Sequence, residues 1–411
     1  MLRNLLQIIH SGFSYPEKNK STPKRDAYHI ALDIENGLLE KNFFKTFKGD
    51  QTGFKDILNR LIHDTAEHRN RINQKKIIVL LANEYINRLL IELVMEIEIL
   101  SAESLGVRGL CCYVKTKTRK ILIDPGIALG YSRYSLLPHP FQIAVDERIR
   151  KKIIKKWAEA TDIVFSHLHG DHVPLVQANP YQLSIHCLSK LAPQVRIWLS
   201  QLEELNNLEK TRFSSLRDIL KPNYRFINSY TRAHNDLHFS KMVFHGERAK
   251  NRNKVFMTCI KEDNFVFVHG SDIQLLDEEA VQIILSWKPD LLVVSGPPLY
   301  LSVKMNDELL QIATNSALIL SNKIPTVIID HHLLRDYQGL DWLRDIDSKT
   351  KNRVLTAAGF MQQPLMMLEA DRLKLYRYMP VGPGWHVQYA QGLVNAQEYC
   401  DKGNKLYREQ N

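Results

Sequence analysis

The chain has 411 residues, more than a single domain usually needs, so we expect one large domain with an appendage or two domains. Hydrophobic residues make up 44% and charged residues 24%, which is close to the globular average and excludes wholesale disorder. The net charge of +10 is compatible with anionic partners, although no basic tail carries it, and the five cysteines form neither a disulfide framework nor a zinc-binding spacing.

Targeting segments are not evident in the sequence. The longest apolar stretch, around residues 77–95, is broken by Asn83, Glu84, Asn87 and Arg88, so it predicts a buried or amphipathic helix instead of a membrane span. The N-terminal apolar patch "LLQII" is shorter than a signal-peptide core. We therefore expect a cytoplasmic protein without a membrane partner.

Residues 1–94 come first in chain order and differ from the remainder. Their apolar residues follow helical spacing, as in "GFKDILNRLIHDTAEHRNRI", and no β-branched alternation interrupts them. This pattern predicts a helical addition at 1–94, whose role the sequence does not indicate, followed by a second domain over 95–411.

From residue 95 onward, strand patterns alternate with helical ones. Strands are predicted at 95–100, 109–116, 120–126, 162–167, 183–188, 255–260, 264–270, 290–296 and 325–330. Helices are predicted at 145–160, 189–208, 277–287 and 304–322. Strands of both alternating and continuous apolar type, separated by helices, favour an α/β sandwich whose sheets are covered on their outer faces.

The densest basic segment is "ERIRKKIIKKW" at 147–157. Ile149, Ile153, Ile154 and Trp157 recur in it at helical spacing, so its charges should occupy one face of an amphipathic helix. A solvated helix face is the simpler interpretation of these charges, and a nucleic-acid patch is the alternative.

The strand at 162–167 runs directly into "FSHLHGDHVPL", which holds His167, His169, Asp171 and His172 within six positions. Side chains at the C-terminal end of a buried strand converge on a cleft, and two histidines two residues apart in extended chain project the same way. Nitrogen and carboxylate donors without thiolate suit zinc, manganese or iron. One histidine would be read as a core residue, but this spacing predicts a metal site with room for two ions.

The His-x-His-x-Asp-His form resembles the metal motif of the metallo-β-lactamase superfamily. That resemblance also accounts for Asp124 in "ILIDPG", which there supports the ligand loops, for His245 beside Gly246, and for Asp272 in "FVFVHGSD", which there bridges two ions. Its implied fold is a four-layer αβ/βα sandwich. His234 and His238 compete with His245 but lack its neighbouring glycine.

The last histidine of that pattern has two candidates in "VIIDHHLLRD". His331 stands four residues before Arg335, a spacing similar to the RNA-processing members, and is favoured; His332 would then face the substrate. "AESLGVRG", "IDPGIAL", "GPPLYL" and "DHHLLRD" are similar to one microbial branch of the superfamily over about residues 95–375, whose members begin near Met95.

The resemblance implies two divalent transition-metal ions, with zinc preferred over manganese or iron. His167, His169 and His245 would hold one ion, Asp171, His172 and His331 the other, and Asp272 would lie between them. The implied activity is hydrolysis by a metal-bound hydroxide. A structural zinc site is the alternative, although such sites usually close with four ligands, often thiolates.

Four residues receive further roles. Asp171 is a candidate to orient the hydroxide or accept its proton, and His332 to donate a proton to the leaving group. Arg108 and Arg335 are candidates to bind an anionic substrate group, with an ion pair between loops as the equal alternative.

Three function classes remain open from sequence. Phosphodiester hydrolysis of nucleic acid or a nucleotide is favoured by the net charge, the basic helix face and the His331–Arg335 spacing. Hydrolysis of a small ester, lactone or thioester is favoured by the apolar and aromatic residues near the motifs, such as Tyr131 and Tyr134. A metal-bound interaction module comes third, because the donor set is intact.

Overall fold

The computed structural model describes residues 95–191, 195–200, 202–220, 224–228, 236–247, 253–301 and 305–408, together with His63 and Ala66. The chain divides into two compact units, and all of these ranges belong to the second, Ile91–Asn411. Apart from His63 and Ala66, the helical addition expected at 1–94 lies outside the described residues and stays a prediction.

The first sheet has six strands, placed side by side in chain order. They are β1 (Glu96–Ile99), β2 (Cys112–Lys115), β3 (Lys120–Ile123), β4 (Asp162–Val164), β5 (Arg196–Leu199) and β6 (Arg225–Asn228). Strands β1, β2 and β3 pair antiparallel, whereas β3 to β6 pair parallel.

The second sheet also has six strands, in the order β14-β13-β12-β11-β10-β7. They are β7 (Leu237–Phe239), β10 (Thr258–Glu262), β11 (Phe265–His269), β12 (Leu291–Val294), β13 (Thr326–Ile329) and β14 (Arg353–Leu355). Strands β11 to β14 pair parallel, and β7, β10 and β11 antiparallel. A separate two-stranded ribbon joins β8 (Val243–Phe244) to β9 (Lys254–Val255).

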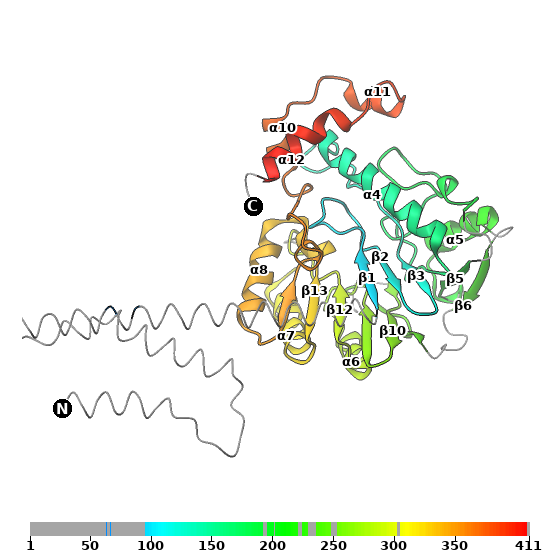
Figure 1. Ribbon diagram of the computed structural model, residues 1–411, viewed down its shortest axis with the longest axis vertical. Coiled ribbons are helices and arrows are strands. Elements are labelled where there is room, and N and C mark those ends of the chain that lie inside the picture. The colour runs from blue at the N-terminus through cyan, green and yellow to red at the C-terminus, as the bar shows by residue number, and fades with distance from the viewer. Residues whose placement is uncertain are drawn as a thin grey trace, which may run out of the picture. The chain divides into compact units, whose positions relative to one another are not determined.

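Helices cover the outer face of each sheet. Helices α4 (Pro140–Glu159) and α5 (Asn207–Leu220) pack on the first sheet, and α6 (Glu278–Trp287), α7 (Asp307–Lys323) and α8 (Tyr337–Ser348) pack on the second (Figure 1). The remaining described helices are η2 (Ile185–Cys187), η3 (Leu202–Glu204), η4 (His331–Arg335), α9 (Ala357–Phe360), α10 (Arg372–Tyr378), α11 (Trp385–Ala390), η5 (Gln397–Tyr399) and α12 (Cys400–Arg408).

Three apolar layers hold these elements together, and alternation along the strands builds them. In β3, Ile121 and Ile123 enter the layer between the sheets, while Leu122 enters the layer beneath α4. In β12, Val293 faces the other sheet and Leu292 faces the helices. Because successive side chains of a strand point to opposite faces, each strand is buried on both sides. The fold is therefore a four-layer αβ/βα sandwich, and the predicted α/β class is confirmed.

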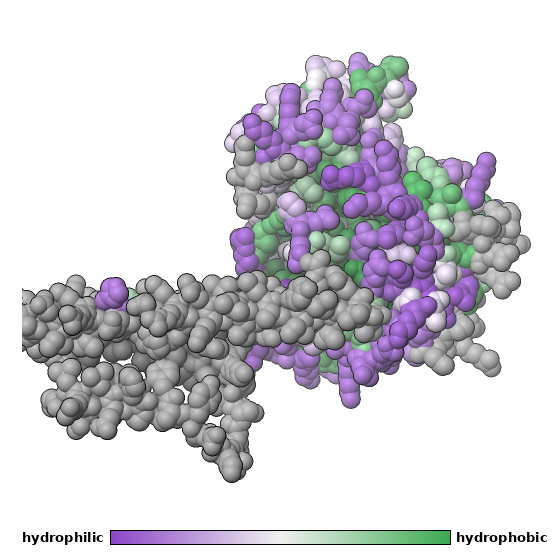
Figure 2. All heavy atoms as spheres, viewed as in Figure 1, coloured by the Kyte–Doolittle hydropathy of each residue, from purple (hydrophilic) through white to green (hydrophobic). Residues whose placement is uncertain are grey.

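Helix α4 shows how the sequence specifies one covering element. Pro140 stands at its first position, and the His139 Nδ1 accepts a hydrogen bond from the Phe141 backbone N–H at 3.1 Å, which caps the helix. Ile153 and Trp157 are fully buried, while Lys151, Lys152 and Lys155 are exposed on the outer side. Figure 2 shows hydrophilic side chains over this helix, so the amphipathic prediction is confirmed.

Two predicted elements are wrong. Residues 183–188 form no strand but the short turn of 3-10 helix η2, because the Ser184 side chain caps it by accepting from the His186 N–H. The helix predicted at 189–208 is interrupted by β5, a buried parallel strand, and the following helix α5 begins only at Asn207. A fully buried short strand cannot be told from a helix by periodicity alone.

No helix in the described part of the chain is long and apolar enough to cross a membrane. The part of the fold that matters for function is the edge at which the parallel strands end. Strands β3 and β4 end at one edge of the first sheet, and β11, β12 and β13 end together at one edge of the second. Loops that leave these ends carry the histidines and aspartates of the candidate site.

Candidate metal centre

The His-rich loop, residues 167–172, leaves strand β4 and turns at once. The backbone N–H groups of His172 and Val173 both donate to the His169 carbonyl at 3.0 Å. Gly126 supports this turn from the loop after β3, since its N–H donates to the His172 carbonyl at 2.9 Å. A Cβ atom on Gly126 would lie 2.2 Å from the Val173 nitrogen, so the two loops touch where only glycine fits.

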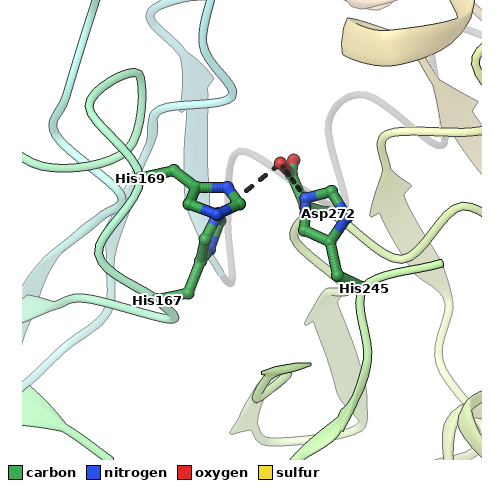
Figure 3. Close-up of side chains that lie close together, drawn as sticks. All are labelled: His167, His169, His245 and Asp272. Atoms are coloured by element: carbon green, nitrogen blue, oxygen red, sulfur yellow. Dashed lines mark hydrogen bonds and ion pairs between the residues drawn. The ribbon is translucent and has the colours of Figure 1, made fainter. Parts of the chain in front are cut away.

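The first cluster of donors consists of His167, His169, His245 and Asp272, whose donor atoms all lie within 4.8 Å of one another (Figure 3). The Asp272 Oδ2 lies 3.0 Å from the His245 Nε2 and 3.6 Å from the His167 Nε2. His245 follows the ribbon strand β8, and Asp272 follows β11. One sheet thus supplies two histidines and the other side supplies the remaining histidine and the carboxylate.

The second cluster consists of Asp171, His172 and His331, again within 4.8 Å of one another. The His331 Nε2 lies 3.6 Å from the Asp171 Oδ2 and 3.3 Å from the His172 Nε2. Its members come from the His-rich loop and from the end of β13. Every histidine and aspartate predicted as a metal ligand therefore lies in one of two neighbouring clusters.

Asp272 joins the two clusters. Its Oδ2 faces His245 and His167, whereas its Oδ1 lies 3.1 Å from the His172 Nε2 and 3.4 Å from the His331 Nε2. A carboxylate whose two oxygens face separate sets of nitrogen donors has the arrangement needed to bridge two ions.

His332 lies on the Asp272 Oδ2 side, with its Nε2 3.0 Å from that oxygen. It forms a further possible donor group with Asp272 and His331. The two adjacent histidines therefore differ: the His331 Nε2 lies by Oδ1 and the second cluster, whereas the His332 Nε2 lies by Oδ2.

Asp124 supports the His-rich loop, although one of its oxygens also lies within 4.8 Å of donor atoms of His167 and His172. Its carboxylate accepts hydrogen bonds from the Ser166 N–H at 2.8 Å and from the Ser271 hydroxyl at 2.8 Å, and it lies 3.0 Å from the His172 Nδ1. Although burial opposes its charge, His172 lowers its pKa to about 2. Asp124 thus orients the ring of His172 by contacting its Nδ1, the nitrogen that points away from the second cluster.

Three residues at this edge have left-handed backbone conformations despite carrying side chains. The φ angles are 48° at Asp124, 53° at Ser271 and 45° at His331. Such conformations cost about 1–3 kcal/mol each and persist where the surrounding contacts over-determine them. Each residue is, or adjoins, a donor or its support, so this strain is concentrated at the candidate centre.

The pKa values of the cluster are set by burial and by close opposite charges. Burial opposes the charge on Asp272 and Asp171, yet the neighbouring His172 and His331 keep both pKa values well below the usual range. Burial, together with His167, lowers the pKa of His169 to about 2. The carboxylates are ionised and His169 is neutral, as metal ligands require. Against the effect of burial, Asp272 raises the pKa of His172 well above its ordinary value and Glu103 raises that of His331 to about 9, so an ion would displace a proton from each of these two rings.

The charges and hydrogen bonds of the site fit divalent cations. Four buried or half-buried carboxylates lie at this edge, those of Glu103, Asp124, Asp171 and Asp272, and the Arg335 guanidinium contacts two of them, Glu103 and Asp171. Negative charge is therefore in excess when the histidines are neutral. In the described part of the chain, the His167 Nε2 and the Asp272 Oδ1 are buried and make no well-oriented hydrogen bond, although the His172 Nε2 lies 3.1 Å from that Oδ1. Both atoms point to the junction of the clusters, where cations would satisfy them.

Both arginines predicted to bind substrate lie in ion pairs. Arg335 is buried, donates to the Glu103 Oε1 at 2.7 Å, and lies 3.3 Å from the Asp171 Oδ2. Arg108 forms a two-point pair with the buried Glu369, and a Cβ on Gly130 would collide with that guanidinium. These contacts match the alternative given for both arginines, an ion pair that holds two loops together. That either arginine also binds substrate stays a prediction.

The rival histidines stand apart from the clusters. His238 lies within strand β7, opposite Cys259, and no donor group among the described residues includes it. His234 lies outside the described residues.

Sequence reasoning missed Glu103. Its carboxylate contacts both His331 and Arg335, which follow it by more than 220 residues. The only available sign was an acidic residue within "AESLGVRG". No spacing rule connects that segment with His331, so the contact becomes visible only in the folded chain.

Comparisons with known proteins place the chain among archaeal relatives, while no family model matches it. It is 44% identical over 310 residues to a UPF0282 protein of Methanosarcina mazei, covering 74% of this chain and 99% of that protein. It is 31% identical to a UPF0282 protein of Korarchaeum cryptofilum, and the match covers 70% of this chain and 96% of that protein.

Solved structures overlap the chain only loosely. The dizinc quorum-quenching lactonase AidC, in complex with a product, shares 16% identity over 50% of this chain and 85% of its own, with a TM-score of 0.29. The CmlA β-hydroxylase shares 11% identity over 64% of this chain and 52% of its own, with a TM-score of 0.36. Overlaps this low support no inference about function.

Proposed function

The chain belongs to the UPF0282 family, and we propose that it is a dinuclear metal-dependent hydrolase of the metallo-β-lactamase superfamily. The observation that carries the proposal is the double cluster, in which the two oxygens of Asp272 face different sets of histidines. A structural site would close around one ion with four ligands, whereas this one offers seven donors from four loops.

The proposed ligands follow the clusters. His167, His169 and His245 would hold the first ion, Asp171, His172 and His331 the second, and Asp272 both. Nitrogen and oxygen donors without thiolate suit zinc, with manganese or iron as alternatives. Such ions, when bound, supply Lewis acidity and lower the pKa of a bound water from about 15.7 towards 7.

Two side chains would manage protons. Asp171 accepts a hydrogen bond from Arg335 and keeps a low pKa, so its carboxylate can orient a water at the second cluster. The buried Nδ1 of His332 has no hydrogen-bond partner among the described residues. We propose that His332 relays a proton to the leaving group: its Nε2–H faces the ionised Asp272 Oδ2 at 3.0 Å, and the lone pair of its Nδ1 takes up a replacement proton.

Phosphodiesters of nucleic acid or nucleotides are the first proposed substrate class. Arg335 contacts Asp171 of the second cluster. The guanidinium groups of Arg335 and Arg133 both lie over the ring of Tyr300, so positive charge extends from the second cluster towards the surface. The basic face of α4 contributes less, because α4 runs back from the donor edge between the parallel strands β3 and β4, and its lysines lie towards the far edge.

A small ester, lactone or thioester is the second proposed class. Each guanidinium near the clusters already has a carboxylate partner, Glu369 for Arg108 and Glu103 for Arg335, which reduces the attraction for a polyanion. Tyr131 and Tyr134 are exposed on the loop before α4 and offer apolar contact area for a small substrate.

Metal analysis combined with a panel of generic phosphodiester, lactone and thioester substrates tests the proposal. We expect close to two transition-metal ions per chain and turnover of one class. For a single-stranded nucleic acid, the logarithm of the affinity should fall with the logarithm of the salt concentration at a slope of roughly −0.7 per neutralised phosphate, whereas the affinity for a singly charged small substrate should scarcely respond. Absence of bound metal, or turnover unchanged by Asp272→Ala, would refute the hydrolase; metal without turnover would favour an interaction module.

We also propose that residues 95–411 form the hydrolase domain and residues 1–94 a separable helical addition. All proposed ligands lie beyond β1, whose strand pairs with β2 inside the first sheet. A protein that starts at Met95 should keep its metal content and its activity. An insoluble or metal-free product would show that the addition is integral to the fold.

A further inference from the structure

Glu103 is buried in the loop after β1, and both of its carboxylate oxygens are occupied. Its Oε2 lies 2.7 Å from the His331 Nδ1, and its Oε1 accepts from the Arg335 Nε at 2.7 Å. One carboxylate therefore fixes a proposed metal ligand and the arginine that reaches the Asp171 carboxylate.

A second contact holds the same loop against the same donor. The Ser104 N–H donates to the Asp330 Oδ1 at 3.1 Å, and that oxygen also accepts from the His331 N–H at 2.8 Å. The Asp330 Oδ2 accepts from the Ala357 N–H at 2.8 Å. Two neighbouring residues of the β1 loop thus hold two neighbouring residues at the end of β13, where His331 has a strained φ of 45°.

The hydrogen bond with Glu103 sets the tautomer of His331. An ionised carboxylate only accepts, so the Nδ1 carries a proton and the Nε2 is the nitrogen left to offer its lone pair to an ion. That lone pair faces the second cluster and the Asp272 Oδ1. His332 has no comparable support, because its buried Nδ1 lacks a hydrogen-bond partner in the described part of the chain.

The two clusters differ in how their histidines are supported. Both histidines of the second cluster have carboxylates behind them, Asp124 for His172 and Glu103 for His331. In the first cluster, the His167 Nδ1 lies 2.9 Å from the hydroxyl of Ser166, which is neutral. A carboxylate behind an imidazole fixes its orientation and raises its strength as a ligand.

From these contacts we propose that Glu103 is a positioning residue that makes His331, and not His332, the last ligand of the second metal position. The inference rests on the proposed metal centre and adds to it a residue that touches neither ion. It also gives the loop "AESLGVRG" a function, since that loop carries the support for a donor at the far end of the chain.

The test is a Zn²⁺ titration of the full chain, after chelation, in the native protein and in Glu103→Gln. The amide keeps the size of the side chain but removes its charge. We expect the second ion to bind 10- to 100-fold more weakly and the first ion to bind unchanged. Glu103→Asp should recover part of the loss, because it restores the charge at a shorter reach. With Co²⁺, the visible absorption of the second ion should change in Glu103→Gln.

The matched control is Glu369→Gln. Glu369 is another buried glutamate whose carboxylate pairs with an arginine, Arg108, but it contacts no histidine of the clusters. Both zinc affinities should stay native in this variant. A loss of the second ion in both variants would mean that burying an uncharged amide disturbs the edge generally, and would overturn the specific role of Glu103.

A double-mutant cycle shows whether Glu103 acts through His331 or through His332, and it does not depend on a single variant. If Glu103 acts through His331, Glu103→Gln should weaken the second ion no further in a His331→Ala background, and should keep its full effect in a His332→Ala background. The reverse pattern, or native affinity in Glu103→Gln, would overturn the inference while leaving the metal centre intact. A native protein that binds no Zn²⁺ would overturn both.

Discussion

The two sheets deliver their donors in opposite ways. The first sheet places His167, His169, Asp171 and His172 on one loop after β4, within six residues. The second side places His245, Asp272 and the pair His331–His332 on three separate connections, after β8, β11 and β13. A single loop fixes its donors by local turns, whereas the scattered donors depend on the register of several strands and on the contact between the two sheets.

The comparison teaches that the halves should fail differently. A substitution in the compact loop changes a local arrangement that Gly126 and Asp124 support from the neighbouring strand. A substitution of His245 or Asp272 on the second side removes a donor that has no other donor of the clusters beside it in sequence. The following variants test this difference, from the largest expected effect to the smallest.

Asp272→Ala should have the largest effect, because each oxygen of this carboxylate faces a different cluster. Its removal takes a donor and a compensating charge from both positions. We expect loss of both ions and of hydrolysis, measured by metal analysis and by turnover. His238→Ala is the control, since this histidine lies within β7 and belongs to no donor group found among the described residues. Two retained ions in Asp272→Ala would show that the clusters do not share it.

His169→Ala should empty the first position and leave the second occupied. His169 belongs to the first cluster alone, and its ring centroid lies 5.1 Å from that of His245. Metal content should fall from about two ions to about one, with loss of turnover. His245→Ala should give the same content, although its donor comes from the other side of the fold. If the two variants bind different numbers of ions, the first cluster does not act as a unit.

Gly126→Ala should disturb the compact loop without removing any donor. The new methyl group would lie 2.2–2.5 Å from the backbone of His172 and Val173, and backbone atoms cannot give way as a flexible side chain does. Overpacking of this kind costs about 1–3 kcal/mol or more. We expect a lower free energy of unfolding and weaker binding of both ions. Gly382→Ala is the matched control, because nothing lies within 4 Å of its added carbon.

His139 offers a smaller, pH-dependent effect confined to the first side of the sandwich. Burial lowers its pKa to about 4 in the folded protein, against about 6.5 when unfolded. Between these values the unfolded chain binds the extra proton, so stability falls as the pH drops from about 6.5 to about 4, by up to about 3 kcal/mol. His139→Asn keeps a capping side chain and should flatten this slope in denaturant unfolding.

Hydrogen exchange would locate the same effect. Protection in α4, which His139 caps, should decline at pH 5, while protection in α7 on the second sheet should change less. An equal decline in both helices, or an unchanged dependence of stability on pH in His139→Asn, would mean that another group causes the loss of stability at acidic pH.

The sequence by itself determined much of this protein. Its alternating and continuous apolar runs predicted most of the strands of both sheets, because a strand that is buried on both faces is apolar along its length whichever strands lie beside it. The motif at 167–172 predicted four donors, because they share one loop. Asp124, His245, Asp272 and His331 followed from a resemblance to a known pattern, not from spacing, since no local rule connects such distant residues.

Tertiary structure decided the rest. Strand β5 and the turn η2 were misjudged because burial and a side-chain cap, which depend on neighbours distant in the chain, override local periodicity. The division of Asp272 between two clusters and the support of His331 by Glu103 join residues 27 to 228 positions apart. Contacts between residues so far apart in the chain depend on how the two sheets pack. The spacing of residues along the sequence does not show which of them come together.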